Sequence, residues 1–235
     1  MIETYNYMCE QINLLLDKQE EDAKNLRNSE FKALQVQINP HFLYNTLDMI
    51  SWMSKSGKNE NVTAAVWILS KFYKLTLSRK ETIGTIEQEL EHISLYVQIQ
   101  NMRFSNKIYF IIDVPDSLME YEIPKLTFQP IVENSILHGI LEKDSKEGNI
   151  VITAWIEDNT IIFFISDDGI GIEPGIVEKI LTGELKRKQG NSNIGINNTH
   201  QRLQLLYGQE FGLSYTSTLG SGTEVELRIP ARKSI

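Results

Sequence analysis

Three glycine-containing segments in the C-terminal half have the composition of nucleotide-binding loops. Residues 167–171 (DDGIG) end a short apolar segment, residues 190–195 (GNSNIG) precede a helical pattern, and residues 220–223 (GSGT) precede the last apolar segment. Glycine allows a positive φ and a close approach of the backbone to a ligand. Three such loops around one sheet predict a nucleotide pocket, although each loop by itself is more typical of an ordinary turn.

Spacing excludes two common nucleotide-binding patterns. No segment matches the G-x-x-x-x-G-K-[ST] pattern of a P-loop. After Gly169 and Gly171, the third glycine of a dinucleotide-binding fingerprint is replaced by Pro174, and the expected order of strands does not suit a Rossmann unit.

His41 offers a possible nucleophile in the N-terminal half. An imidazole nitrogen can attack the γ-phosphorus of a nucleotide in line and form a phosphoramidate. Pro40 removes a backbone donor and disturbs the helix beside it, which would favour local bending. A single histidine on a helix is more typical of a surface residue, so this role depends on the sequence around it.

The N-terminal half has the pattern of amphipathic helices. Residues 3–56 contain no glycine, one proline and many good helix formers, and Gly57 predicts the end of that helix. A second helix over residues 62–76 would complete a hairpin that cannot bury both of its faces, so pairing with a second copy as a four-helix bundle is expected. A third helix over residues 86–103 begins at a capping-box pattern, Thr85-x-x-Gln88.

The C-terminal half changes to short apolar segments separated by turns. Strands are expected at residues 109–114, 150–156, 160–166, 213–217 and 223–229. Helices are expected from Pro124, in a first turn, to His138, and at residues 174–181 and 196–207. This order predicts an α+β domain in which helices cover one face of a largely antiparallel sheet.

Composition narrows the possible functions. The chain has 235 residues, a net charge of −8 and 23% charged residues, so it is globular and unsuited to general nucleic-acid binding. Its single cysteine, Cys9, excludes an internal disulfide and a zinc site of several thiolates, and favours an intracellular setting. The longest apolar run, residues 64–69, is too short to span a membrane, and no signal peptide is apparent.

Four segments together resemble the Bergerat (GHKL) ATP-binding fold. Residues 130–139 (PIVENSILHG) resemble its N box, 167–171 its G1 box, 193–196 (NIGI) its G2 box and 220–223 its G3 turn. Upstream, residues 35–47 (QVQINPHFLYNTL) are similar to the phosphoacceptor motif of LytS/YesM-like sensor histidine kinases.

The resemblance implies a division of the chain into three parts. Residues 1–30 would end a HAMP-like signalling linker, residues 31–82 would form the dimerisation and phosphoacceptor hairpin, and residues 83–235 would form the ATP-binding catalytic domain with a helical lead-in. The fold implied is an N-terminal helical hairpin followed by an α/β sandwich with a mixed, largely antiparallel sheet. The chain would be the cytoplasmic portion of a membrane-anchored sensor whose anchoring segments are missing from this sequence.

The resemblance also assigns roles to individual residues, with ATP and Mg²⁺ as cofactors. Asp167 would accept a hydrogen bond from the adenine amine, Asn134 would ligate Mg²⁺, and His138 would either line the phosphate side or be a structural histidine. The other residues expected to contact the nucleotide are Gly169, Gly171, Asn193, Gly195, Gly220, Gly222 and Thr223.

In the hairpin, the resemblance makes His41 the phosphoacceptor and Asn45 a residue that positions water for dephosphorylation of a regulator. Phe42 stands where many histidine kinases have an acidic general base. His92 and His200 have no such context and are expected at the surface.

Three further positions depart from the wider pattern. Pro130 stands where hydrolases of this fold have the water-activating glutamate, and Glu133 points away from Asn134, so steady ATP hydrolysis is disfavoured. Leu137 stands where a lysine is common, so one phosphate contact is missing. The basic residues 186–188 in the ATP lid either supply that contact instead or are simply solvated.

Two functions remain open from the sequence. The first is a homodimeric sensor kinase that phosphorylates its own histidine from ATP and passes the phosphoryl group to an aspartate of a response regulator receiver domain. The second is an ATP-responsive dimeric signalling scaffold without kinase activity.

Overall fold

The computed structural model describes residue 18 and residues 40–57, 59–77, 82–173, 175–182 and 192–233. The expected signalling linker over residues 1–30 lies outside this range except for residue 18, as do the basic residues 186–188. No helix within the described ranges is both long enough and apolar enough to cross a membrane. All elements below belong to the unit Ile38–Ile235.

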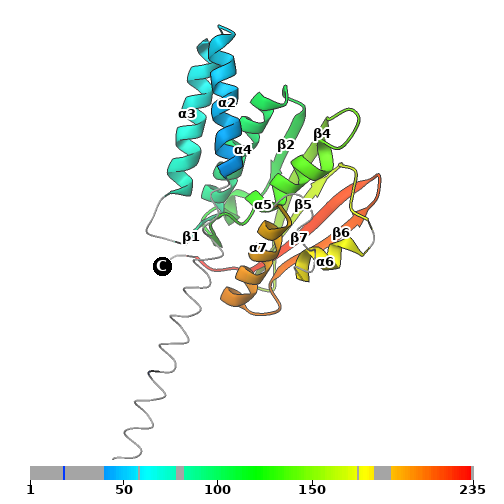
Figure 1. Cartoon of the computed structure of the whole chain (residues 1–235). Helices are drawn as coiled ribbons and strands as arrows, with labels where there is room; N and C mark the ends of the chain where they lie inside the picture. The colour runs from blue at the N-terminus through cyan, green and yellow to red at the C-terminus, as the bar shows by residue number, and fades with distance from the viewer. Residues whose placement is uncertain are drawn as a thin grey trace, which may run out of the picture. The chain divides into compact units, whose positions relative to one another are not determined.

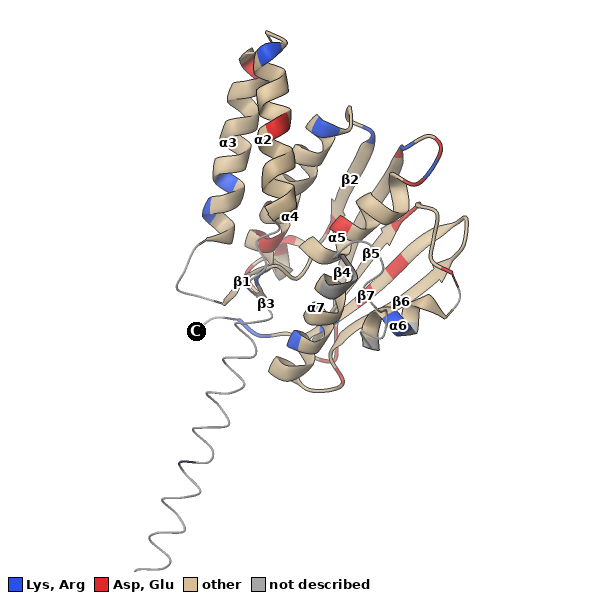
Figure 2. Ribbon diagram, viewed as in Figure 1, with Lys and Arg blue, Asp and Glu red and all other residues tan. Residues whose placement is uncertain are grey.

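Two helices form the expected hairpin (Figure 1). Helix α2 (Pro40–Lys55) and helix α3 (Asn59–Thr76) lie side by side, and Gly57 in the turn has a φ of +73°. One face of the pair is buried through Phe42, Met49 and Ile68. Figure 2 shows few charged residues on either helix, so most of the remaining surface of the hairpin is uncharged.

Helix α4 (Ile86–Arg103) begins where its capping box places it. The Thr85 hydroxyl accepts from the Gln88 backbone N–H, and the Gln88 side chain accepts in return from the Thr85 N–H, both at 3.2 Å. This arrangement satisfies two donors of the first turn that have no partner within the helix. The predicted helix over residues 86–103 is confirmed to the residue.

A five-stranded sheet forms the other layer, and helices α5 and α7 cross one of its faces (Figure 1). The strand order is β2-β4-β5-β7-β6, in which β2 and β4 are parallel and the other neighbours are antiparallel. This confirms the mixed, largely antiparallel sheet. The strands are β2 (Ile108–Asp113), β4 (Gly148–Glu157), β5 (Thr160–Asp167), β6 (Gly212–Thr218) and β7 (Gly222–Pro230).

The elements between these strands are short except for α7. Their bounds are η1 (Asp116–Leu118), α5 (Gln129–Asn134), the π-helical η2 (Ser135–Ile140), α6 (Ile176–Thr182) and α7 (Ser192–Tyr207). Helix α5 continues directly into η2, so one helical segment carries the whole residue 129–140 region.

The prediction that a helix begins at Pro124 is wrong. Pro124 ends a short strand, β3 (Glu122–Pro124), which pairs antiparallel with β1 (Ile83–Thr85). The chain then makes a turn in which Leu126 has a φ of +60°, and Pro130 occupies the first turn of α5 instead. Pro130 suits that position because its missing N–H would have had no helical partner there.

An aromatic cluster joins the hairpin to α4. Phe42 of α2 lies 5.2 Å from Phe72 of α3 and 5.0 Å from Tyr96 of α4, measured between ring centroids. Aromatic pairs at these separations contribute about 0.5–1.5 kcal/mol each beyond the area that they bury. The hairpin is therefore packed against α4 through the residue that follows His41.

His92 belongs to the same cluster, so its expected surface position is wrong. Its ring stacks on Phe72 with centroids 4.4 Å apart, and its Nε2 lies 2.9 Å from the Thr76 hydroxyl. That hydroxyl donates to the Phe72 carbonyl, so it accepts from an Nε2–H. Nδ1 is buried with no partner among the described residues, and burial lowers the pKa of His92 to about 4.

His200 is also not a free surface residue. It is half-buried, and its Nδ1 accepts from the Leu213 backbone N–H at 3.0 Å, which joins α7 to the start of β6. Burial lowers the pKa of this imidazole as well.

Candidate functional site

Asp167 lies at the end of β5, opposite Thr223 of β7, and its side chain is 9% exposed. Its Oδ1 accepts from the Gly169 backbone N–H at 2.9 Å, and the carboxylate also accepts from the Ser135 hydroxyl and the Thr223 N–H. Burial raises the pKa of Asp167, and these donors partly offset that rise. The result is a carboxylate in a low-dielectric setting whose acceptor geometry is fixed by three elements.

Gly169 lies so close to η2 that no side chain would fit between them. A Cβ atom built on Gly169 would lie 2.5 Å from the Cα of Gly139, and one on Gly139 would lie 3.1 Å from Oδ1 of Asp167. The Ile170 N–H donates to the Gly139 carbonyl at 3.2 Å. Glycine at position 169 is therefore required for this close approach of η2 to the segment after β5, and glycine at position 139 leaves room for the Asp167 carboxylate.

The other three predicted glycines of this region lie where the segment after β5 meets the connection between β6 and β7. Gly222 has a φ of +108°, and a Cβ there would be 2.0 Å from the Asp167 carbonyl. Gly171, with a φ of +72°, would clash with the Thr218 carbonyl at 2.2 Å, whereas Gly220, with a φ of +83°, faces open space. The Gly220 N–H donates to the Ile170 carbonyl at 2.6 Å, so the G1 and G3 segments are bonded together.

Thr223 completes this part of the site. Its hydroxyl lies 2.9 Å from the Ser217 hydroxyl, which donates to the Gly222 carbonyl at 2.9 Å. Ser217 also accepts from the Ile172 N–H at 2.8 Å. Asp167, Thr223 and the glycines at 169, 171, 220 and 222 therefore form one cluster.

Asn134 and His138 are one turn apart on the segment formed by α5 and η2. Asn134 is the last residue of α5, and its Oδ1 is buried with no hydrogen-bond partner among the described residues. A carbonyl oxygen without a donor is a suitable ligand for Mg²⁺, which prefers oxygen. His138 is exposed on η2.

Gly195 brings the first turn of α7 against α5. A Cβ on Gly195 would lie 3.2 Å from Cβ of Pro130, so the proline that replaces the hydrolytic glutamate fills the contact with the G2 segment. The backbone of Asn193 is in the first turn of α7, and its side chain lies outside the described atoms.

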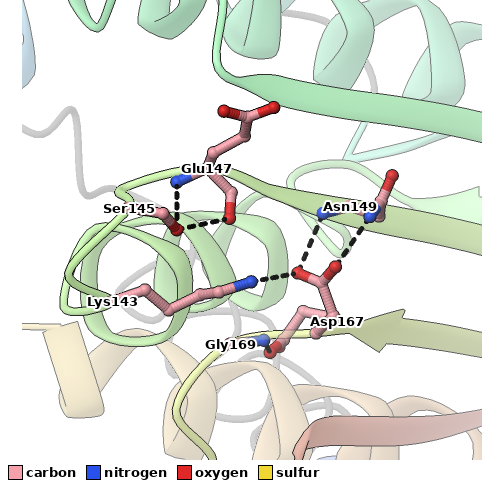
Figure 3. A network of polar contacts seen from close by, with 7 residues as sticks. Lys143, Ser145, Glu147, Asn149, Asp167 and Gly169 are labelled. Atoms are coloured by element: carbon pink, nitrogen blue, oxygen red, sulfur yellow. Dashed lines mark hydrogen bonds and ion pairs between the residues drawn. The ribbon is translucent and has the colours of Figure 1, made fainter.

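Sequence reasoning missed a polar network that holds the G1 segment from the side (Figure 3). Asp168 accepts from the Asn149 backbone N–H at 2.9 Å, from the Asn149 amide at 2.7 Å and from Lys143 at 3.1 Å. Partial burial raises the pKa of Asp168, but these donors outweigh it and lower the pKa overall. Gly148, the first residue of β4, makes room for this carboxylate, because a Cβ there would lie 2.3 Å from Oδ1 of Asp168.

His41 and Asn45 lie together on α2, in the hairpin layer. His41 is exposed, and the Asn45 amide nitrogen is 3.1 Å from its Nε2 and 3.2 Å from its Nδ1. The next residue, Phe42, is 5% exposed. The His41 imidazole is thus exposed to solvent, while the buried side chain of Phe42 holds the helix backbone beside it in place.

Comparison with known proteins gives two family matches. A family described as "Histidine kinase" matches residues 29–108, and one described as "Histidine kinase-, DNA gyrase B-, and HSP90-like ATPase" matches residues 122–233. Sensor histidine kinase YesM of Bacillus subtilis (strain 168) is 32% identical over 98% of this chain and 38% of that protein. Sensor histidine kinase BtsS of Escherichia coli (strain K12) is 31% identical over 93% of this chain and 36% of that protein.

The chain thus spans less than two fifths of the length of these curated relatives. Among solved structures, the nucleotide-free catalytic domain of histidine kinase ThkA superposes with a TM-score of 0.50 at 15% identity, over 65% of this chain and 97% of that chain, which shows a shared fold. The chain belongs to the histidine kinase family, with a helical histidine kinase region followed by an ATPase domain of the type shared with DNA gyrase B and HSP90.

Proposed function

We propose that this chain is an ATP-dependent protein-histidine kinase that phosphorylates its own His41. The observation that carries the proposal is the exposed His41 imidazole with Asn45 beside it, in a chain whose sheet domain clusters Asp167, Thr223 and four glycines. The ATPase domain implies ATP binding. A buried carboxylate such as Asp167 selects adenine because it accepts from the exocyclic amine, which guanine lacks at that position.

The reaction follows from the lone pair on a neutral imidazole. A ring nitrogen of His41 attacks the γ-phosphorus, a phosphorus–nitrogen bond forms, and the bond to the β–γ bridging oxygen breaks as ADP leaves with the electron pair. The other ring nitrogen then releases its proton to solvent, which exposure of the ring permits. Phe42 cannot act as a base, so a loose transition state that needs little proton removal suits this site.

Mg²⁺ is proposed as the cation of this reaction, with Asn134 as its protein ligand. Support comes from Oδ1 of Asn134, a buried acceptor with no donor among the described residues. When bound, the cation would neutralise charge on the phosphate oxygens. His138 on the same segment would then face the phosphate side.

Three further parts of the proposal concern partners and location. A homodimer is supported by the hairpin face, where Tyr44, Leu47, Trp52, Val66 and Trp67 remain exposed. The phosphoryl group would pass to an aspartate of a response regulator receiver domain, whose carboxylate attacks phosphorus as the bond to nitrogen breaks. The chain would lie on the cytoplasmic side of a membrane, as part of a longer sensor.

Incubation with γ-labelled ATP and Mg²⁺ tests the kinase activity. We expect an acid-labile, alkali-stable label on the wild type and none on His41→Ala, while His41→Ala keeps the wild-type Kd for ATP because His41 lies on α2. Nucleotide binding with no label on the wild type would contradict the proposal and favour a non-catalytic scaffold.

The role of Asn45 is tested in the same system. Asn45→Ala should keep the label on His41 and slow the dephosphorylation of a phosphorylated receiver domain. Unchanged dephosphorylation would contradict the proposed positioning of water.

A further inference from the structure

Glu89 is a charged residue that the mechanism does not use, yet it is only 3% exposed. Its Oε1 accepts from the Leu126 N–H at 2.8 Å, and its Oε2 accepts from the Thr127 N–H at 3.0 Å. Burial raises the pKa of Glu89, and the backbone donors together with the charge of Arg202 oppose that rise. A buried carboxylate is costly unless it is paired and hydrogen-bonded, so its position here calls for a role.

The turn held by Glu89 contains an uncommon backbone conformation. Leu126 has a φ of +60°, which is uncommon for a residue with a branched side chain. Thr127 follows, and its hydroxyl donates to the Pro124 carbonyl at 2.5 Å. Both oxygens of one side chain on α4 therefore hold the backbone immediately before α5.

Arg202 approaches the same turn from α7. It is 2% exposed, and its Nη2 donates to the Thr127 hydroxyl at 3.1 Å. Burial lowers the pKa of Arg202 to about 10, and attraction to Glu89 opposes that fall, so the guanidinium is charged at neutral pH.

The two contacts of α7 with α5 and the turn before it lie on one face of α7. Gly195 and Arg202 are seven residues apart, which is close to two full turns, so both face α5. Gly195 meets Pro130, and Arg202 meets Thr127. These two contacts join one face of α7 to the segment that ends at Asn134 and to the turn before it.

We propose that Glu89, Thr127 and Arg202 form a buried clasp that positions the ATP site. Glu89 holds the turn before α5, Arg202 ties α7 to that turn, and the clasp thereby places Asn134 and the G2 segment at Gly195 relative to each other. None of the three is a catalytic residue, since each acts through the backbone of α5 or α7. The inference rests on the proposed function for the identity of the ligand.

The clasp also gives α4 a part in nucleotide binding. Glu89 is in the first turns of α4, while Tyr96 and His92 of the same helix pack against the hairpin. Helix α4 therefore contacts both Phe42, the residue after His41, and the turn that precedes α5, the helix that ends at Asn134.

Isothermal titration of the 235-residue chain with ATP and Mg²⁺ tests the clasp through its Kd and stoichiometry. The variants are Glu89→Gln, which removes the charge, and Thr127→Val, which removes the hydroxyl and keeps the shape. We expect Glu89→Gln to raise the Kd by ~10-fold or more, as loss of a supporting partner typically does, and Thr127→Val to raise it less. Glu87→Gln is the matched control, because Glu87 is exposed on the same helix and should leave the Kd unchanged.

The stoichiometry separates positioning from mere stability. If Glu89 and Thr127 only stabilised the fold, the variants would lower the fraction of binding-competent protein and leave the Kd of that fraction at the wild-type value. That result would overturn the inference. If Glu89→Gln does not fold, Thr127→Val decides alone: a raised Kd supports the clasp, and an unchanged Kd overturns it.

The same titration keeps the inference distinct from the proposed function. A wild type that binds no ATP would contradict both. A wild type that binds ATP but does not label His41 would contradict the kinase alone, and the Kd values of the variants would still decide the clasp.

Discussion

Asp167 combines near-complete burial with donors from three elements, and this combination holds its carboxylate in one orientation. The Gly169 N–H, the Ser135 hydroxyl and the Thr223 N–H fix the plane of its oxygens. Little rotation is left, so a donor on a ligand must arrive in one orientation. A side chain held this way discriminates between bases more sharply than a mobile one.

Asp167→Asn should therefore weaken ATP binding. The amide would present an N–H where the carboxylate accepts, and leaving buried polar groups mismatched costs about 1–3 kcal/mol, or roughly tenfold or more in Kd. Titration with ATP measures this, with Asp113→Asn as a control, since Asp113 is an exposed aspartate at the end of β2. An unchanged Kd for Asp167→Asn would exclude Asp167 from adenine recognition.

His92 should make stability fall in mild acid. Its pKa is about 4 in the folded protein and near 6.5 when unfolded, so the unfolded chain binds more protons between these values. The neutral ring's contribution to the free energy of unfolding is complete above pH 6.5 and declines as the pH falls. At pH 5 this contribution is lower by about 2 kcal/mol.

Denaturant unfolding of the wild type and His92→Phe at pH 7.5 and pH 5 checks this. The phenyl ring keeps the stacking on Phe72 but does not titrate, so the variant should lose less stability than the wild type over that interval. Equal losses would mean that His92 is charged in the folded protein.

At the residue scale, the sequence singled out residues whose pattern lies within one short segment and missed residues that meet only across different helices. Asp167 and its glycines stand in a short segment whose spacing is distinctive. Glu89 and Arg202 lie on different helices and become informative only when folding buries them together. The surface position expected for His92 is wrong because no residue near it in the sequence indicates its stacking on Phe72.

Among the elements, η2 packs on the G1 segment so closely that an added methyl group has no room. Gly169→Ala would place a methyl group 2.5 Å from the Cα of Gly139, so η2 and the end of β5 must separate. Overpacking of this kind typically costs about 1–3 kcal/mol. We expect a lower midpoint of thermal unfolding and a weaker affinity for ATP.

Gly220→Asn is the matched comparison within the same site. Gly220 also belongs to the cluster, but no atom lies within 4 Å of a Cβ there, and asparagine tolerates a positive φ. It should lower the unfolding midpoint much less than Gly169→Ala. Similar losses would show that conformation, rather than contact with Gly139, governs this region.

Elements with a strong local signal were predicted well, and one that depends on a distant contact was not. Helix α4 follows from its capping box, and the β4–β5 hairpin follows from two apolar segments around a three-residue turn. The start of α5 was misplaced at Pro124 because pairing with β1 and the two hydrogen bonds to Glu89 hold that stretch extended or turned. Neither the pairing with β1 nor the hydrogen bonding to Glu89 is indicated by the residues that follow Pro124.

For the whole molecule, the hairpin face predicts self-association. Trp52 and Trp67 are 60% and 61% exposed, although tryptophan is usually well buried. Trp52→Glu should convert a dimer to a monomer in analytical ultracentrifugation at micromolar concentration. Trp155→Glu is the control, since Trp155 is 41% exposed but lies on the outer face of the sheet, and it should leave the dimer intact.

The aromatic contact beside His41 has a thermal consequence for the molecule. Phe42 belongs to the hairpin and Tyr96 to α4, so any swing of one against the other exposes aromatic surface to water. Newly hydrated apolar surface raises the heat capacity. If such a swing precedes phosphoryl transfer, the Eyring plot of autophosphorylation is curved, and Phe42→Leu, which has less surface to expose, flattens it. A linear plot would mean that the hairpin and α4 stay together, so the temperature dependence of one rate constant reports whether they part before the phosphoryl group moves.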